Sequence, residues 1–366
     1  MTAHTALFSA GSEGIKPRPI RVFIIDDSSV VRAIFSRLIQ SEEGLELAGT
    51  AVSAEEGLSL LGALHVHVIL LDLEMPGMGG MRALPEIIKR SGSAKVMVVS
   101  SLTAEGAEHT VEALSLGAAD ALLKPGPGSF DQQYRDKLVE RIKSLGHRPL
   151  RRSDPSFSKQ SSPIARSMKT AVRPEVLAIG ASTGGIHATG QFLTALPPAI
   201  GIPIIITQHL PVEFSRPYAS QLHDVSGRDV VIAADGIELV PDRIHLAPGD
   251  AHVTVIQRDH KYVIRLDRAH SETGCMPSVD QMFLSLVQVF GAHALGVVLT
   301  GMGRDGTNGA RAIVEAGGNV LVQNEVSSAV WGMPGSIARA GLAAAILHPR
   351  DLATRIAASL SFAAPQ

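Results

Sequence analysis

A serine, a histidine and an aspartate in the C-terminal half of the chain have the side chains needed for nucleophilic acyl transfer. Ser182, His209 and Asp305 each follow an apolar, strand-like run, and these runs cover 176–179, 202–207 and 295–299. If the runs form neighbouring parallel strands, their carboxyl ends meet in one crevice and the three side chains lie together. Ser182 would then attack a carbonyl, His209 would take and return its proton, and Asp305 would orient the imidazole.

The turn that carries Ser182 favours this hypothesis. Gly180-Ala181-Ser182-Thr183-Gly184-Gly185 stands between the first apolar run and a helical pattern at 186–196, which predicts a strand, a tight turn and a helix. The spelling fits G-x-S-x-G, a pattern in which the serine is a nucleophile on such a turn. The unpaired N–H groups at the start of the helix suit a developing oxyanion.

Other functions are compatible with parts of this pattern. A glycine-rich strand–helix turn is more often a phosphate cradle, but a dinucleotide site needs an acidic residue at the end of the next strand, where this chain has Gln208-His209. No Walker-type GKS or GKT follows the glycines. A DNA-binding output domain would need a basic recognition helix, which the glycine-rich pattern does not suggest. A partner-binding module without catalytic activity stays open as the alternative.

The N-terminal half carries a second cluster of polar residues at the ends of strand-like runs. Asp26 and Asp27 follow the first run, Asp72 the third, Ser100 the fourth and Lys124 the fifth. The runs cover 20–25, 45–51, 66–71, 95–99 and 121–123, with helical patterns between them, which predicts a doubly wound α/β fold with a parallel sheet. Clustered carboxylates repel one another unless a cation such as Mg²⁺ lies among them. Asp72 would accept a phosphoryl group, Lys124 would pair with it, and Ser100 would bind its oxygens.

The length of 366 residues suggests two or three domains, and the composition predicts a soluble cytoplasmic protein. The net charge of −2 gives no indication of binding to nucleic acid or a membrane, and residues 1–19 lack the pattern of a signal peptide. The single cysteine, Cys275, fits a reducing compartment, and we assign it no role. We expect a disordered leader at 1–19, domains at 20–143 and 174–361, a flexible linker rich in Ser, Pro and basic residues at 144–173, and a tail at 362–366.

Residues 20–143 resemble a response-regulator receiver domain. The resemblance rests on Asp26-Asp27, on LLDLEMPGMGG around Asp72, on Ser100-Ser101 and on Lys124-Pro125. It implies a flavodoxin-like fold and phosphorylation of Asp72 by a histidine kinase of the chemotaxis type. It also implies Mg²⁺ held by Asp26, Asp27, Asp72 and the backbone of Glu74. Gly79 and Ala121 depart from the usual pattern, since receivers often have an aromatic switch residue at the position of Ala121.

Residues 174–361 resemble the catalytic domain of chemotaxis protein-glutamate methylesterases. The carrying stretches are IGASTGG, TQHLP, APGD, PSVDQMF, LTGMGRDG and QNEVSSAVWGMP. The resemblance implies a doubly wound, mostly parallel sheet, with Ser182, His209 and Asp305 as the triad and the backbone N–H groups of Thr183 and Met302 at the oxyanion. It also implies hydrolysis of glutamyl methyl esters on chemoreceptors, deamidation of receptor glutamines, and no catalytic metal. Nucleic-acid binding and membrane insertion are not expected.

Two departures from this second family pattern leave the triad unaffected. Met276 precedes PSVD where a basic residue is usual, and Asp250 replaces a frequent glycine. Because a phosphoacceptor site and a triad are joined by a flexible linker, we expect the first domain to lie over the Ser182 crevice. Phosphorylation of Asp72 would then release the esterase.

Overall fold

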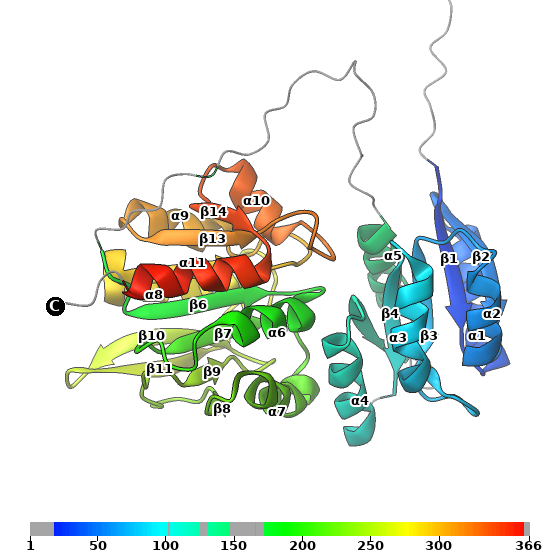
Figure 1. Cartoon of the computed structure of the whole chain (residues 1–366), viewed down its shortest axis with the longest axis horizontal. Helices are drawn as coiled ribbons and strands as arrows, with labels where there is room; N and C mark the ends of the chain where they lie inside the picture. Colours follow the sequence, from blue (N-terminus) through cyan, green and yellow to red (C-terminus); the bar gives the residue numbers. More distant parts are fainter. Residues whose placement is uncertain (1–17, 102, 125–129, 147–164, 166–171, 362–366) are drawn as a thin grey trace, which may run out of the picture.

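The computed structural model describes residues 18–101, 103–124, 130–146, 165 and 172–361, which form two α/β domains (Figure 1). The expected leader and linker lie mostly outside these residues, and the expected tail lies wholly outside them. No helix in the described part of the chain combines the length and apolar character needed to cross a membrane.

The N-terminal domain is a five-stranded sheet with helices packed on it, as the alternating pattern predicts. All its strand pairs are parallel, in the order β2-β1-β3-β4-β5. Its elements are β1 (Ile20–Ile25), α1 (Ser29–Ser41), β2 (Leu45–Ala51), α2 (Ala54–Leu61), β3 (Val68–Asp72), α3 (Gly80–Ser91), β4 (Lys95–Ser100), α4 (Ala104–Ser115), β5 (Asp120–Leu123) and α5 (Gln132–Gly146). The helix α5 continues to Gly146, beyond the expected boundary at 143.

The C-terminal domain is built on a seven-stranded sheet in the order β14-β13-β12-β6-β7-β9-β8. Its first elements are β6 (Val176–Ala181), α6 (Gly185–Ala195), β7 (Ile204–Gln208), the short helix η1 (Val212–Phe214), α7 (Ser215–Ser226), β8 (Val230–Ile232) and β9 (Ile244–Leu246). The chain then forms β10 (His252–Arg258), β11 (Lys261–Asp267), α8 (Val279–Phe290), η2 (Gly291–His293) and β12 (Ala294–Val298). It closes with α9 (Thr307–Glu315), β13 (Asn319–Gln323), α10 (Met333–Arg339), β14 (Ala345–Leu347) and α11 (Pro349–Ser361).

Burial of both faces explains why the central strands read as continuous apolar runs. Every residue of β6, β7 and β12 is buried, which is the pattern of parallel strands covered by helices on both sides. All described pairings within the seven-stranded sheet are parallel, and β10 and β11 form a separate antiparallel hairpin. The predicted doubly wound, mostly parallel architecture is confirmed.

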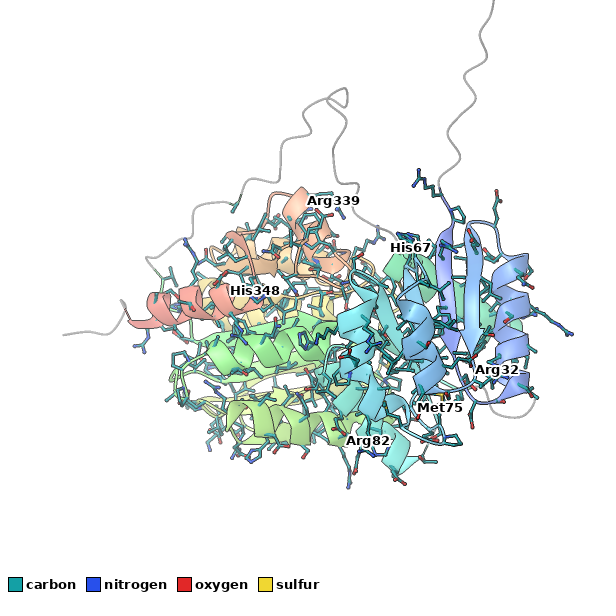
Figure 2. All side chains as sticks on the ribbon, turned by 45° about the vertical axis from the view of Figure 1, so that its right-hand side comes forward. Arg32, His67, Met75, Arg82, Arg339 and His348 are labelled. Atoms are coloured by element: carbon teal, nitrogen blue, oxygen red, sulfur yellow. The ribbon has the colours of Figure 1, made fainter. Side chains whose placement is uncertain are left out.

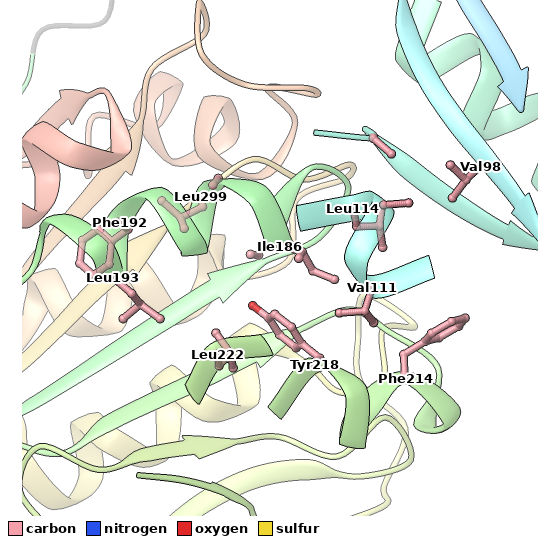
Figure 3. Packing of buried hydrophobic residues seen from close by; sticks show 14 of the residues in the cluster. Val98, Val111, Leu114, Ile186, Phe192, Leu193, Phe214, Tyr218, Leu222 and Leu299 are labelled. Carbon is pink, nitrogen blue, oxygen red and sulfur yellow. The ribbon is translucent and has the colours of Figure 1, made fainter. Parts of the chain in front are cut away.

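The receiver-like domain packs against the second domain through α4, which contacts α6, α7 and η1 (Figure 1). Val111 and Leu114 of α4 belong to the same buried apolar cluster as Ile186, Phe214 and Tyr218 of the second domain, and Figure 3 shows these side chains around the junction. Polar contacts border this cluster. Ser115 accepts a hydrogen bond from Gln221 Nε2 through its Oγ at 2.9 Å, and its carbonyl oxygen lies 2.8 Å from Nδ1 of His187 on α6.

Candidate active site

Three adjacent strands bring Ser182, His209 and Asp305 to one edge of the large sheet. The central strand β6 pairs with β12 on one side and β7 on the other, with Ala181 opposite Gln208. Ser182 and His209 each follow one of these paired residues, and His209 N donates to Ala181 O at 3.0 Å. The expectation that the three apolar runs are neighbouring parallel strands is therefore confirmed.

The turn at Ser182 has the strand–turn–helix form expected from its sequence. Gly185 N donates to Ser182 O at 2.8 Å, and Gly184, the N-cap of α6, has a φ of +77°. This left-handed conformation favours glycine. A Cβ at Gly185 would lie 2.2 Å from Oε1 of Gln208, so glycine is also needed for the close approach of β7. Gln208 in turn donates from Nε2 to Ser182 O at 2.8 Å, which ties the turn to the strand that carries His209.

The partly buried His209 and the buried Asp305 form a hydrogen-bonded pair. Nε2 of His209 lies 2.9 Å from Oδ2 of Asp305, whose side chain is 1% exposed. Asp305 also accepts hydrogen bonds at the N-terminus of α8, from Val279 N at 2.7 Å and from Ser278 Oγ at 2.9 Å. The carboxylate is therefore held in one orientation by a helix end that favours negative charge.

The charges of this pair reinforce each other. Burial works to lower the pKa of His209, but hydrogen bonds and charge from Asp305 and Cys275 outweigh it and raise the pKa to about 9. Burial works to raise the pKa of Asp305, but His209 and the donors at the start of α8 lower it to about 2. Asp305 is thus an anion at neutral pH, suited to orient and stabilise an imidazolium.

Cys275, to which the sequence assigns no role, lies beside this pair. Its Sγ, a ring nitrogen of His209 and a carboxylate oxygen of Asp305 all lie within 4.8 Å of one another. Cys275 comes from the irregular segment between β11 and α8, and no strand end or motif spacing relates it to His209. The sequence could not predict this position, because the packing of the loop, and not a strand end or a motif, places the thiol of Cys275 beside His209.

The candidate oxyanion donors lie on the turn after Ser182 and on the loop after β12. The N–H groups of Thr183 and Met302 donate no hydrogen bond to another described residue, so both are available to an oxyanion. Ser182 and Thr183 line a cavity of about 70 Å³ together with His209 and with Asp120 and Arg141 of the receiver-like domain.

The polar strand ends of the N-terminal domain also converge as expected. One carboxylate oxygen from each of Asp26, Asp27 and Asp72 lies within 4.8 Å of the other two. Lys124 Nζ donates to Asp72 Oδ2 at 2.6 Å. Ser100 Oγ is buried without a hydrogen-bond partner among the described residues. Three carboxylates fit a hard cation such as Mg²⁺, and the unpartnered hydroxyl fits an incoming phosphoryl oxygen.

Hydrogen bonds from α1 hold the loop that carries Asp26 and Asp27, and a backbone N–H after β3 holds the side chain of Asp72. Arg32, labelled in Figure 2, donates to the carbonyl oxygens of Asp26 and Asp27 at 2.7 and 2.8 Å. Glu74 N donates to Asp72 Oδ1 at 3.0 Å. Burial nevertheless raises the pKa of Asp72 to about 6, against the opposing effects of Lys124 and Glu74.

Both halves of the chain match known families. Residues 177–356 match the family model of the CheB methylesterase, and residues 22–133 match that of the response regulator receiver domain. The chain is 35% identical to protein-glutamate methylesterase/protein-glutamine glutaminase 1 of Rhodospirillum rubrum, over 92% of this chain and 94% of that protein. It is 39% identical to protein-glutamate methylesterase/protein-glutamine glutaminase 2 of Caulobacter vibrioides, over 90% of this chain and 95% of that protein.

A solved structure agrees with these sequence matches. The catalytic domain of the Thermotoga maritima CheB methylesterase superposes with a TM-score of 0.50 at 30% identity, covering 51% of this chain and 99% of that chain. The hydrogen-bonded His209–Asp305 pair and the glycine turn of Ser182 lie within the matched region. The chain therefore belongs to the CheB methylesterase family, with a response-regulator receiver domain joined to the methylesterase domain.

Proposed function

We propose that this chain is a protein-glutamate methylesterase that hydrolyses glutamyl methyl esters of chemoreceptors and also deamidates receptor glutamines. The observation that carries the proposal is the His209–Asp305 hydrogen bond of 2.9 Å at the strand edge where the turn of Ser182 lies. Family membership supports the same activity, because the relatives at 35–39% identity bear the name of this esterase and glutaminase.

The reaction follows from the orientation of the imidazole. Since Nε2 of His209 is bonded to Asp305, Nδ1 is the nitrogen left to take the proton of Ser182. Ser182 Oγ bonds to the ester carbon, and the N–H groups of Thr183 and Met302 stabilise the oxyanion. The intermediate collapses, methanol leaves with the proton from His209, and an acyl-serine remains. Water, deprotonated by His209, then attacks the acyl carbon, and the bond to Ser182 Oγ breaks as His209 returns the proton to Ser182 and glutamate leaves. With a glutamine substrate, ammonia leaves in place of methanol.

We further propose that phosphorylation of Asp72 by a chemotaxis histidine kinase activates the esterase in the cytoplasm. Asp26, Asp27, Asp72 and the backbone of Glu74 would hold Mg²⁺, which neutralises charge around the phosphoryl group when bound. Lys124 would pair with the phosphoryl group, and Ser100 would turn its hydroxyl toward it. This movement at the end of β4 would reach α4, which packs against the catalytic domain.

The contacts between the domains support inhibition of the unphosphorylated protein. Asp120 lies 3.3 Å from Thr183 Oγ1, and Ser144 Oγ lies 2.8 Å from Sδ of Met302, so the receiver touches both candidate oxyanion segments. A chemoreceptor is a large substrate and needs this surface to reach Ser182.

Methanol release from methylated receptors tests the proposal directly. We expect release by the full-length protein with Mg²⁺ and a small-molecule phosphodonor, and almost none with Ser182→Ala. A wild-type protein that binds receptors but releases neither methanol nor ammonia would refute the esterase and favour a partner-binding role.

A further inference from the structure

The helices α8 and α9 exchange the carboxylates that cap them. Asp305 stands directly before Gly306, the N-cap of α9, but its side chain reaches α8 instead, where it accepts from Val279 N at 2.7 Å and Asp280 N at 3.2 Å. Asp280 lies in the first turn of α8, and its side chain reaches α9, where Oδ1 accepts from Gly309 N at 2.7 Å. The first turn of α8 therefore binds the carboxylate that precedes α9, in addition to its own N-cap Ser278, and the first turn of α9 binds a carboxylate from α8.

The exchange compensates for the position of Asp305 at the active site. Gly306 has a φ of +89° and no side chain, so α9 has no side-chain cap of its own. Asp305 cannot serve, because its carboxylate is occupied by His209 and α8. Gly309 is the third residue of α9, and the N–H group at this position is one that a capping oxygen normally accepts from. Asp280 therefore supplies the missing cap.

Close packing makes this arrangement sensitive to the length and charge of Asp280. The side chain is 7% exposed, and a Cβ at Gly309 would lie 2.5 Å from Cβ of Phe283 on α8. Burial and the nearby charge of Asp305 raise the pKa of Asp280 to about 6, against the hydrogen bond from Gly309. Two neighbouring carboxylates repel each other, and the two helix N-termini offset that repulsion.

We propose that Asp280 is a positioning residue for the esterase reaction. It holds the start of α9 and therefore the segment 305–309. Asp305 can then keep its hydrogen bonds to the N-terminus of α8 and to Nε2 of His209. The inference rests on the proposed triad, and Asp280 itself touches no substrate. A merely structural cap would affect stability alone, whereas a positioning residue also sets the rate of the chemical step and the protonation of His209.

Kinetics of full-length Asp280→Ala and Asp280→Asn, with Mg²⁺ and phosphodonor, distinguish the two roles. We expect Asp280→Ala to lower kcat for methanol release by about 10- to 100-fold with little change in KM, because small displacements of catalytic groups have effects of this size. Asp280→Asn keeps an acceptor oxygen for Gly309 and should recover part of the rate. The matched control is Ser285→Ala, since Ser285 is equally buried on α8 but accepts from Val255 N on β10.

The second measurement does not depend on esterase activity. Nitrogen-resolved NMR of the histidine rings, with His209→Gln for assignment, follows the pKa of His209 in each variant. Asp305 and Cys275 are the titratable groups that face His209 among the described residues. Displacing Asp305 should therefore lower the pKa from about 9 toward the ordinary value near 6.5, only partway because Cys275 remains. Ser285→Ala should leave it unchanged.

The outcomes separate this inference from the proposed function. A wild-type kcat and a wild-type His209 titration in Asp280→Ala would overturn the positioning role, as would equal changes in Ser285→Ala. If the wild-type protein releases no methanol, the proposed function fails, and the NMR titration still decides whether Asp280 positions Asp305. If Asp280→Ala does not fold, Asp280→Asn provides both measurements.

Discussion

Asp120 of the receiver domain lies 3.3 Å from Oγ1 of Thr183, the residue that follows Ser182. Asp120 is the first residue of β5, and Arg141 of α5 pairs with its other carboxylate oxygen at 3.1 Å. The receiver thereby places a carboxylate, the functional group of the esterase product, at the turn where the substrate ester must bind. This contact is a specific candidate for the inhibitory latch.

Replacing Asp120 by alanine should raise the activity of the unphosphorylated protein. A single hydrogen bond contributes about 0.5–1.5 kcal/mol, so its loss should increase methanol release without phosphodonor by a few-fold, up to about tenfold. Asp136→Ala is the control, because Asp136 is exposed on α5 and accepts a local hydrogen bond from Gln132 on the same helix. Equal basal rates in Asp120→Ala and wild type would exclude Asp120 as a latch.

Ser182→Ala should remove nearly all ester hydrolysis without unfolding the protein. Loss of a nucleophile from a triad lowers turnover by on the order of 10⁴–10⁶-fold. Methanol release and circular dichroism measured on the same samples separate catalysis from folding, with Ser226→Ala on α7 as a remote serine control. Wild-type-like release from Ser182→Ala would remove Ser182 from the mechanism.

The rate should rise with pH up to about 9. His209 must be neutral to take the proton of Ser182, and its pKa is raised to about 9, so the imidazolium predominates at neutral pH and the base form grows as pH increases. Asp305→Asn removes the main group that raises this pKa, so the profile should shift to lower pH while activity falls, yet stays above the Ser182→Ala background. Asp305→Asn with wild-type activity and profile would contradict the assignment.

Cys275→Ser should move the same pH profile in the same direction but by less. Hydrogen bonding and charge from Cys275 contribute to the raised pKa of His209, after the contribution of Asp305. Cys275→Ser removes the sulfur that contributes to the raised pKa, so the midpoint of the profile should fall while kcat at high pH is largely kept. An unshifted midpoint would mean that the thiol does not influence His209.

Stimulation by phosphodonor should require Asp72 and Mg²⁺. We expect full-length protein to be stimulated and Asp72→Asn or EDTA-treated protein not to be, with residues 174–366 active without a donor. Ser100→Ala should still accept the phosphoryl group but respond less, because the buried hydroxyl is the group poised to bind it. If residues 174–366 are no faster than the unphosphorylated full chain, the receiver does not inhibit and phosphorylation must act by recruiting the esterase to receptors.

The strand-end residues could be predicted from the sequence because their placement follows from topology. Ser182 and His209 come directly after buried apolar strands, and Asp72 closes one. In a doubly wound sheet, residues after parallel strands meet at one edge whatever the details of the loops. The fold class and the convergence of the three triad candidates could therefore be predicted from the apolar runs and the residues that follow them. The prediction needs only the rule that the carboxyl ends of parallel strands meet at one edge.

The remaining features of the site depend on the tertiary structure. They bring together segments whose contact cannot be predicted from any periodic pattern in the sequence. Cys275 reaches His209 from an irregular loop, and Asp120 reaches Thr183 across the boundary between the domains. The crossed capping of Asp280 and Asp305 needs the packing of α8 on α9, which the glycine at 309 makes possible. The sequence by itself predicted the chemistry and determined the edge of the sheet at which the candidate residues lie. The packing of helices and loops decided how the acid is held, how far the histidine is charged and what covers the serine, because these depend on distances between side chains rather than on strand order.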